Sequence, residues 1–147
     1  MKITLHFVLH WIWSAVFGLL IISGFALTGA KFGWLMNYNL PQADFIHRTF
    51  AVVFTFLTIV AVGMEIFRIA TGGKAMVWLI VGKSGFQLFT LLISLVFIIT
   101  GVFIWTCNEY SKAAMVFGYE THELAAFVIA GALIWHLYKK AHALILD

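Results

Sequence analysis

The chain has 147 residues, of which 63% are hydrophobic and only 10% are charged, and its mean hydropathy is +1.03. A soluble domain typically has about 25% charged residues, so this composition excludes an ordinary soluble protein and predicts an integral membrane protein. The formal net charge of +3 is small and bears on orientation in the membrane, with no indication of nucleic-acid binding. The single cysteine, Cys107, excludes an internal disulfide.

Four apolar segments are each close to the roughly 20 residues that a helix needs to cross the hydrocarbon core of a bilayer. In chain order they cover residues 5–28, 45–69, 85–106 and 121–139. The first is too long for the hydrophobic region of a signal peptide and is expected to remain as an anchor. The short apolar piece 75–82 is expected to lie at the membrane interface. We therefore predict an all-α membrane protein, in which residues 1–147 form a single four-helix transmembrane bundle.

The positive charges indicate how such a bundle is oriented. An even number of spans places both termini on one side of the membrane. Six Lys and Arg residues fall on that side, and three fall on the other side: Lys2, Arg68, Lys74, Lys83, Lys139 and Lys140 against Lys31, Arg48 and Lys112. Because cytoplasmic loops carry an excess of Lys and Arg, both termini are expected to be cytoplasmic.

Four histidines lie inside or at the ends of the predicted spans: His10, His47, His122 and His136. Ionisable side chains at membrane depth are costly and are usually functional. His122 and His136 are fourteen residues apart, which places them about 21 Å apart along one helix and within about 40° of the same face. In the predicted topology, His10 lies at the depth of His136, and His47 lies at the depth of His122.

This arrangement indicates haem binding. Haem iron takes two axial ligands that face each other across the porphyrin, and neutral imidazole is a common ligand. Only histidines at equal depth on different helices can pair in this way. The sequence therefore predicts two b-type haems, one held by His10 and His136 and the other by His47 and His122. The chain has no C-x-x-C-H motif, so each haem would be held without thioether bonds.

Alternatives remain open at several of these positions. A single histidine in a helix is commonly a hydrogen-bonded polar residue and not a ligand. His6 lies one turn before His10 and is an alternative ligand, whereas His142 lies about 200° around the helix from His122 and is interpreted as an interfacial residue. Four glycines within the spans either allow close helix packing or make room for a porphyrin: Gly18, Gly24, Gly101 and Gly131.

Three stretches carry a resemblance to a known family. His-Trp at 10–11 precedes Ile-Ser-Gly-Phe-Ala-Leu-Thr-Gly at 22–29, Gly-Phe-Gln-Leu-Phe at 85–89 leads to Ile-Thr-Gly-Val-Phe-Ile-Trp at 99–105, and His-Glu-Leu-Ala-Ala-Phe at 122–127 precedes Trp-His-Leu-Tyr at 135–138. With the four histidines in order, the chain resembles the di-haem cytochrome b (gamma) subunits of respiratory formate dehydrogenases. That family is related to the b-type cytochromes of nickel–iron hydrogenases and to bacterial cytochrome b561. The likeness covers nearly the whole chain. The chain is shorter than many subunits of this family, so the resemblance does not identify the partner enzyme.

The resemblance implies a relay of electrons across the inner (cytoplasmic) membrane of a prokaryote. One end of the relay would be a membrane quinone, menaquinone or ubiquinone, near the cytoplasmic face. The other end would be an iron–sulfur subunit on the outer face, attached to a catalytic dehydrogenase or reductase subunit. The chain itself would be an electron-transfer subunit that does not act on the substrate. The alternatives are a stand-alone cytochrome b561-like quinone oxidoreductase and a haem-free transporter or assembly subunit.

Further candidate binding residues lie near the two membrane faces. Arg48, beside His47, matches the carboxylate of a haem propionate, with an ordinary interfacial arginine as the alternative. The turn at 71–74 offers Gly73 and Lys74 to a quinone near the cytoplasmic face. Glu65 either carries protons to that quinone or pairs with Arg68 three residues later.

Two segments are expected to be exposed on the outer side. They cover residues 31–44 and 108–119 and are rich in aromatic and polar side chains. We interpret them either as the surface that meets the partner subunit or as anchors at the membrane interface.

Overall fold

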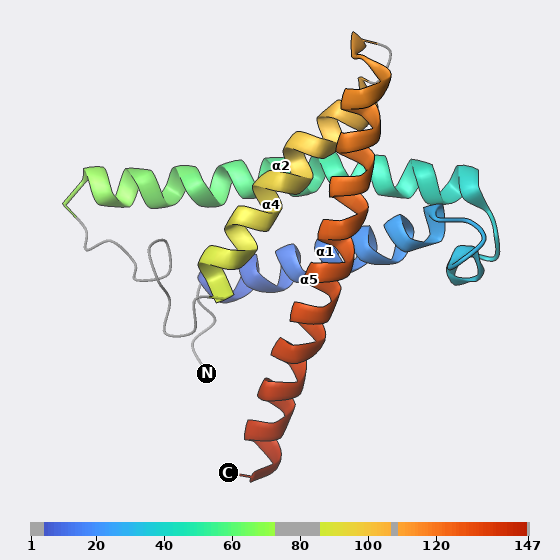
Figure 1. The fold of residues 1–147 in the computed structure, drawn as a ribbon. Helices are drawn as coiled ribbons and strands as arrows, with labels where there is room; N and C mark the ends of the chain where they lie inside the picture. The colour runs from blue at the N-terminus through green and yellow to red at the C-terminus, as the bar shows by residue number, and fades with distance from the viewer. Residues whose placement is uncertain (1–4, 73–85, 107–108, 147) are drawn as a thin grey trace. The chain divides into compact units, whose positions relative to one another are not determined.

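The computed structural model describes residues 5–72, 86–106 and 109–146, and within these ranges the regular structure is entirely helical (Figure 1). In chain order, the elements are α1 (Leu5–Leu27), the 3-10 helix η1 (Gly33–Met36), α2 (Leu40–Ala70), α4 (Phe86–Trp105) and α5 (Lys112–Leu146). The prediction of an all-α protein is confirmed over these residues.

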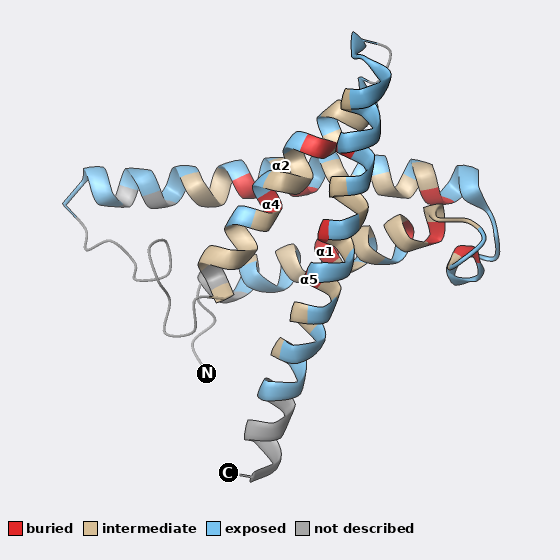
Figure 2. Cartoon of the chain, viewed as in Figure 1, coloured by how far each residue is buried: buried red, intermediate tan, exposed pale blue. Residues whose placement is uncertain are grey.

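Among the described residues, three helices are long and apolar enough to cross a membrane. The segments concerned are Val8–Leu27, Leu40–Met64 and Leu88–Trp105. Only 17%, 11% and 11% of these respective apolar stretches are buried within the structure, and Figure 2 shows few buried residues on these helices, which are mostly tan or pale blue. A helix that is apolar on all sides is typical of a membrane span, and these three helices identify a membrane-type protein.

The helix α5 contains the fourth predicted span but is not among these three. Its apolar stretch is interrupted by Thr121, His122 and Glu123 at one end and by His136 near the other. A bundle of four spans stays a prediction.

The chain divides into two compact units, Met1–Ala75 and Met76–Asp147. In the first unit α1 packs against α2, and in the second unit α4 packs against α5. Each pair is an antiparallel helical hairpin, because residues late in the first helix meet residues early in the second. In the first unit, for example, Ser23 of α1 meets His47 of α2.

Aromatic rings hold the middle of the first hairpin together. Phe17 of α1 stacks on Trp13, with 5.0 Å between the ring centroids, and meets Phe54 of α2 at 5.6 Å. Phe17 and Phe54 are buried, and aromatic pairs of this kind contribute about 0.5–1.5 kcal/mol beyond the area that they bury. This cluster sets the distance between the two helices on which the candidate site depends.

The connection between α1 and α2 is short and structured. The backbone takes left-handed conformations at Asn37 and Tyr38, with φ values of 55° and 60°. The Tyr38 ring then lies over Gly33, where an added Cβ atom would be only 2.7 Å from Cδ1 of the tyrosine. Gly33 is therefore required for this close approach.

The start of α2 at Leu40 corrects the predicted boundary at residue 45. The Asn39 side chain accepts a hydrogen bond from the backbone N–H of Gln42 at 3.1 Å, and Pro41 occupies the first turn. Asn is a favoured N-cap residue, and proline is tolerated in the first turn because its missing N–H has no partner there. The segment 31–44 therefore contains η1 and the first turn of α2, so it is more ordered than predicted.

The second hairpin likewise corrects a predicted loop. The helix α5 already begins at Lys112, and the Ser111 hydroxyl accepts a hydrogen bond from the backbone N–H of Ala114 at 3.3 Å. A serine in this position caps the orphan N–H groups of a helix start. Most of the segment 108–119 is therefore helical. The predicted interfacial piece 75–82 lies outside the described residues.

Candidate functional site

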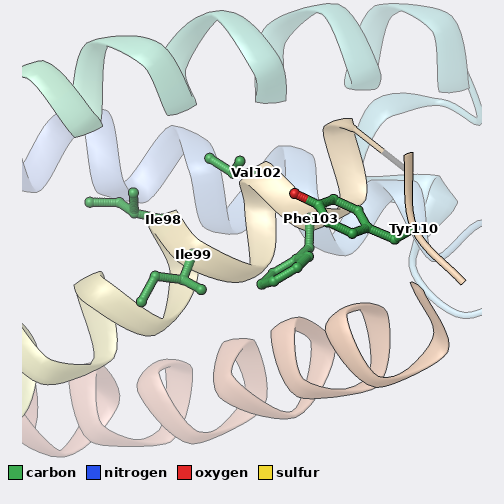
Figure 3. A pocket seen from close by; sticks show the side chains of 5 residues that line it. All are labelled: Ile98, Ile99, Val102, Phe103 and Tyr110. Atoms are coloured by element: carbon green, nitrogen blue, oxygen red, sulfur yellow. The ribbon is translucent and has the colours of Figure 1, made fainter. Parts of the chain in front are cut away.

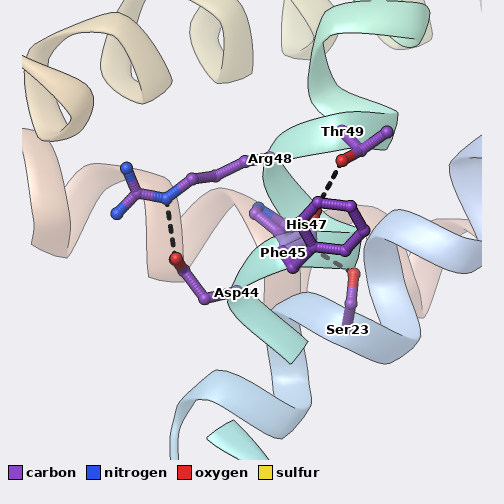
Figure 4. Close-up of polar contacts among 6 residues, drawn as sticks. All are labelled: Ser23, Asp44, Phe45, His47, Arg48 and Thr49. Atoms are coloured by element: carbon purple, nitrogen blue, oxygen red, sulfur yellow. Dashed lines mark hydrogen bonds and ion pairs between the residues drawn. The ribbon is translucent and has the colours of Figure 1, made fainter. Parts of the chain in front are cut away.

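His47 projects from the second turn of α2 toward α1, where it meets a serine. Its Nδ1 atom lies 3.2 Å from the Oγ atom of Ser23, as Figure 4 shows. Ser23 is almost completely buried, with 1% of its surface exposed, and its hydroxyl also donates to the carbonyl oxygen of Leu19 at 2.7 Å. The imidazole is thus fixed against the neighbouring helix by a buried polar contact.

Gly24 makes room for this imidazole. A Cβ atom added at position 24 would lie 3.0 Å from Cε1 and 3.3 Å from Nδ1 of His47. Contacts this short are tighter than most real Cβ contacts, so an alanine there would require the ring to move by a few tenths of an ångström. The histidine ring consequently lies directly over the backbone of α1.

His122 is held in the same manner in the second unit. Its Nδ1 atom lies 2.8 Å from Oγ1 of Thr100 on α4, and Thr100 is also buried, with 6% exposure. The Thr100 hydroxyl donates to the carbonyl oxygen of Val96 at 2.6 Å. Phe97 places its ring edge-on to the imidazole with 5.0 Å between centroids, and Gly101 would bring a Cβ atom to 3.8 Å from Cε1.

The two units therefore contain the same arrangement. In each unit, a hydroxyl residue and the glycine after it, on the first helix of the hairpin, contact an imidazole from the second helix. We call it the hydroxyl–glycine–histidine site. The pair is Ser23–Gly24 with His47 in the first unit and Thr100–Gly101 with His122 in the second. The histidine follows the hydroxyl residue by 24 and 22 positions, respectively.

The Thr-Gly pair at 28–29, which ends the first resembling stretch, does not contact a histidine in the same way. In the structure, the Thr28 hydroxyl donates to the carbonyl oxygen of Phe25, and Gly29 has a positive φ of 59° just beyond the end of α1. The counterpart of Thr100–Gly101 is Ser23–Gly24, and the similar intervals to a histidine are the signal that would have found it.

The other two predicted ligands lie toward the opposite ends of the hairpins. His10 is exposed, contacts Trp11 edge-on at 6.0 Å, and precedes Ser23 by thirteen residues, which is about 20 Å along α1. His136 stacks on Phe86 with 4.5 Å between centroids and 10° between the ring planes. Each unit thus offers two imidazoles that are far apart along the hairpin. Each predicted pair takes one histidine from each unit, and both pairings stay predictions.

Arg48 has a partner in the structure. Its Nε atom donates to Oδ1 of Asp44 at 2.9 Å, and the two side chains are 51% and 45% exposed, respectively (Figure 4). An exposed pair of this kind, four residues apart on a helix, contributes little to stability. It fits an ordinary interfacial arginine, and a role toward a propionate stays a prediction.

Several other predicted site residues have side chains that lie outside the described part of the structure. Glu65 and Arg68 belong to α2, but their side chains fall outside the described part of the structure, as do those of His6 and His142. Gly73 and Lys74 lie beyond the described residues altogether. The predicted quinone site therefore stays a prediction.

A shallow apolar hollow of about 240 Å³ lies in the second unit (Figure 3). It is lined by Ile98, Ile99, Val102, Phe103 and Tyr110. Ile99 and Val102 are themselves exposed apolar side chains. None of the predicted ligands lines the hollow, so it is not part of the histidine sites.

His47 and His122 each have a hydrogen-bond partner at Nδ1, a feature that metal-ligating histidines share. Within residues 5–72, 86–106 and 109–146, no three His, Cys, Asp or Glu side chains gather to hold an ion. A b-type haem needs only two protein ligands. Ligating histidines almost always hydrogen-bond through their second ring nitrogen, and at His47 and His122 the hydroxyls are within reach of Nδ1. No family model, curated protein or solved structure matches the chain.

Proposed function

We propose that the chain is a di-haem cytochrome b, a membrane subunit that relays electrons across the bilayer between the quinone pool and a partner redox subunit. The observation that carries this proposal is the repetition of the hydroxyl–glycine–histidine site. Two independent hairpins each hold an imidazole by its Nδ1 atom beside a glycine. Similar placement of two histidines is expected if both bind one kind of ligand.

In the proposed arrangement His47 and His122 hold one haem, and His10 and His136 hold the other. A b-type haem with two imidazole ligands supplies a one-electron carrier. The residues of the chain bind and orient it: imidazoles supply the ligand nitrogens, and Ser23 and Thr100 fix two of the rings. The apolar helices α1, α2 and α4 keep water away, and α5 serves as the fourth span.

The partners are proposed from the family resemblance. A menaquinone or ubiquinone would bind near the cytoplasmic face, with Glu65, Gly73 and Lys74 as its candidate residues. An iron–sulfur subunit with a catalytic dehydrogenase or reductase would bind on the outer face of a prokaryotic inner membrane. Co-purification with an iron–sulfur protein supports this version, whereas turnover with quinone and a small acceptor by the chain alone supports the stand-alone oxidoreductase.

The experiment that tests the function is spectroscopic. The chain is purified from membranes in mild detergent, and reduced-minus-oxidised absorption spectra are recorded together with a chemical determination of haem and protein. We expect a b-type spectrum and two haems for each chain. A preparation that is folded and helical by circular dichroism, but has no b-type band even after incubation with haem, contradicts the proposal. That result would favour the haem-free transporter or assembly subunit.

A further inference from the structure

Two buried hydroxyls each contact both a backbone carbonyl and an imidazole. The Ser23 Oγ atom lies 2.7 Å from the oxygen of Leu19 and 3.2 Å from Nδ1 of His47. In the other unit, Oγ1 of Thr100 lies 2.6 Å from the oxygen of Val96 and 2.8 Å from Nδ1 of His122. Each hydroxyl also has a longer contact with a second carbonyl oxygen, that of Leu20 at 3.3 Å or Phe97 at 3.4 Å. It has one proton for these three contacts.

The proton can be assigned from the chemistry of the partners. A carbonyl oxygen only accepts, so the contacts of 2.6 and 2.7 Å require the hydroxyl proton; without it, two oxygen atoms with lone pairs would face each other at that distance. The proton between each hydroxyl and its imidazole must then come from the ring. Only an Nδ1–H group satisfies both contacts, because the hydroxyl oxygen still has lone pairs to accept it.

We infer that Ser23 and Thr100 are matched positioning residues, which lock His47 and His122 in the tautomer with the proton on Nδ1. The lone pair of each imidazole is thereby placed on Nε2, the nitrogen that is directed away from the hydroxyl. This tautomer preference is a property of the chain itself. The further step, in which Nε2 acts as a ligand nitrogen to a metal centre, rests on the proposed function.

The lock is stable because both hydroxyls are buried. In the other tautomer, Nδ1 would bring a lone pair to a hydroxyl whose proton is already committed to a carbonyl. The hydroxyl would then have to leave the carbonyl, which keeps its bond to the helical N–H, or the ring nitrogen would be left without a proton to share. The Nδ1–H form is favoured because it alone keeps both the hydroxyl–carbonyl and the hydroxyl–imidazole contacts. A histidine that donates from its second nitrogen is also a more basic ligand.

The chain contains two matched control residues for the hydroxyl–imidazole contact. Ser94, with 1% exposure, donates to the carbonyl oxygen of Thr90 at 2.6 Å, and Thr58, with 6% exposure, donates to that of Phe54 at 2.8 Å. Both are buried hydroxyls with the same bond to the residue four positions earlier. The controls separate loss of a buried hydroxyl from loss of the contact with an imidazole.

The first experiment measures the tautomers directly. The full chain is produced without haem in lipid nanodiscs with ¹⁵N-labelled histidine, and the ring nitrogens are resolved by NMR, with assignment by single His→Gln variants. We expect His47 and His122 in the Nδ1–H form. Thr100→Val should shift His122 toward the Nε2–H form, and Ser23→Ala should shift His47 in the same direction but less, because that ring also has a backbone hydrogen bond with Leu20. Ser23→Thr, Thr100→Ser, Ser94→Ala and Thr58→Val should cause no such shift.

The second experiment uses the haem-loaded protein and measures reduction potentials. Ser23→Ala and Thr100→Val each remove a hydrogen bond that strengthens the ligand, so both should raise the potential of the same haem. Ser94→Ala and Thr58→Val should leave the reduction potentials of both haems unchanged.

The inference is overturned if either ring is in the Nε2–H form in the unaltered chain. It is also overturned if Ser23→Ala and Thr100→Val give the same histidine spectra as the two control variants. A chain that binds no haem would contradict the proposed function alone, because the histidine spectra still decide the tautomers.

Discussion

The ring of His47 lies so close to Gly24 that a side chain at position 24 would press on it. A methyl group on Gly24 would be 3.0 Å from Cε1 of His47, whereas the equivalent group on Gly101 would be 3.8 Å from Cε1 of His122. The first distance requires the ring to move, and the second is an ordinary van der Waals contact. The two hydroxyl–glycine–histidine sites therefore differ in how tightly the ring is held.

This difference predicts unequal effects of two alanine substitutions. Gly24→Ala should push His47 against its contact with Ser23 and weaken the binding of the haem proposed for His47. Gly101→Ala should leave both haems bound, because His122 need not move. The measurement is the ratio of haem to protein in purified variants, together with the redox titration of each.

Gly18→Ala is the control for the change from glycine to alanine in α1. No atom lies within 4 Å of the added methyl group at position 18, and alanine favours a helix over glycine by about 0.8–1.0 kcal/mol. This variant should retain both haems and be at least as stable. Equal haem loss in Gly24→Ala and Gly18→Ala would show that contact with His47 is not the cause.

The helices could be predicted from the sequence because apolar segments of membrane length leave few alternatives. Their ends were predicted less well, since Asn39 and Ser111 act as caps only through local hydrogen bonds that hydropathy does not register. The histidines were evident as polar residues in apolar helices. Ser23 and Thr100 were not identified as their partners, because that contact depends on which residues of two packed helices lie at the same level.

The pairing of the four histidines predicts which variants share a phenotype. His47→Ala and His122→Ala should each remove one and the same haem, because either change leaves only one protein ligand. His10→Ala and His136→Ala should each remove the other. Haem quantification with separate redox titration of the two centres measures this directly. Loss of the same haem in His10→Ala and His122→Ala would instead exclude the pairing by depth.

Arg48 and Asp44 allow a test of the propionate interpretation. Because their ion pair is about half exposed, breaking it on a helix surface should change the free energy of unfolding by only about 0.3–0.5 kcal/mol. Asp44→Asn and Arg48→Gln should therefore have equally small effects in a denaturant titration. If Arg48 also contacts a propionate, Arg48→Gln alone should shift the potential of the haem held by His47. Identical potentials in the two variants would identify Arg48 as an ordinary interfacial residue.

Two phenylalanines of α4 contact different histidines and should therefore affect different haems. Phe86 stacks on His136 at 4.5 Å, and Phe97 meets His122 edge-on at 5.0 Å. Replacing either ring with leucine keeps an apolar side chain but removes an aromatic contact worth about 0.5–1.5 kcal/mol, which corresponds to about two- to tenfold weaker binding of the haem concerned.

Phe86→Leu should weaken the haem held by His136 and spare the haem held by His122, and Phe97→Leu should do the reverse. Each variant thus serves as the control for the other, because both lie on the same helix and carry the same substitution. The measurement is the transfer of haem from each variant to an excess of apomyoglobin, followed at the absorption band of each centre. Faster loss of the same haem from both variants would contradict the assignment of His122 and His136 to separate haems.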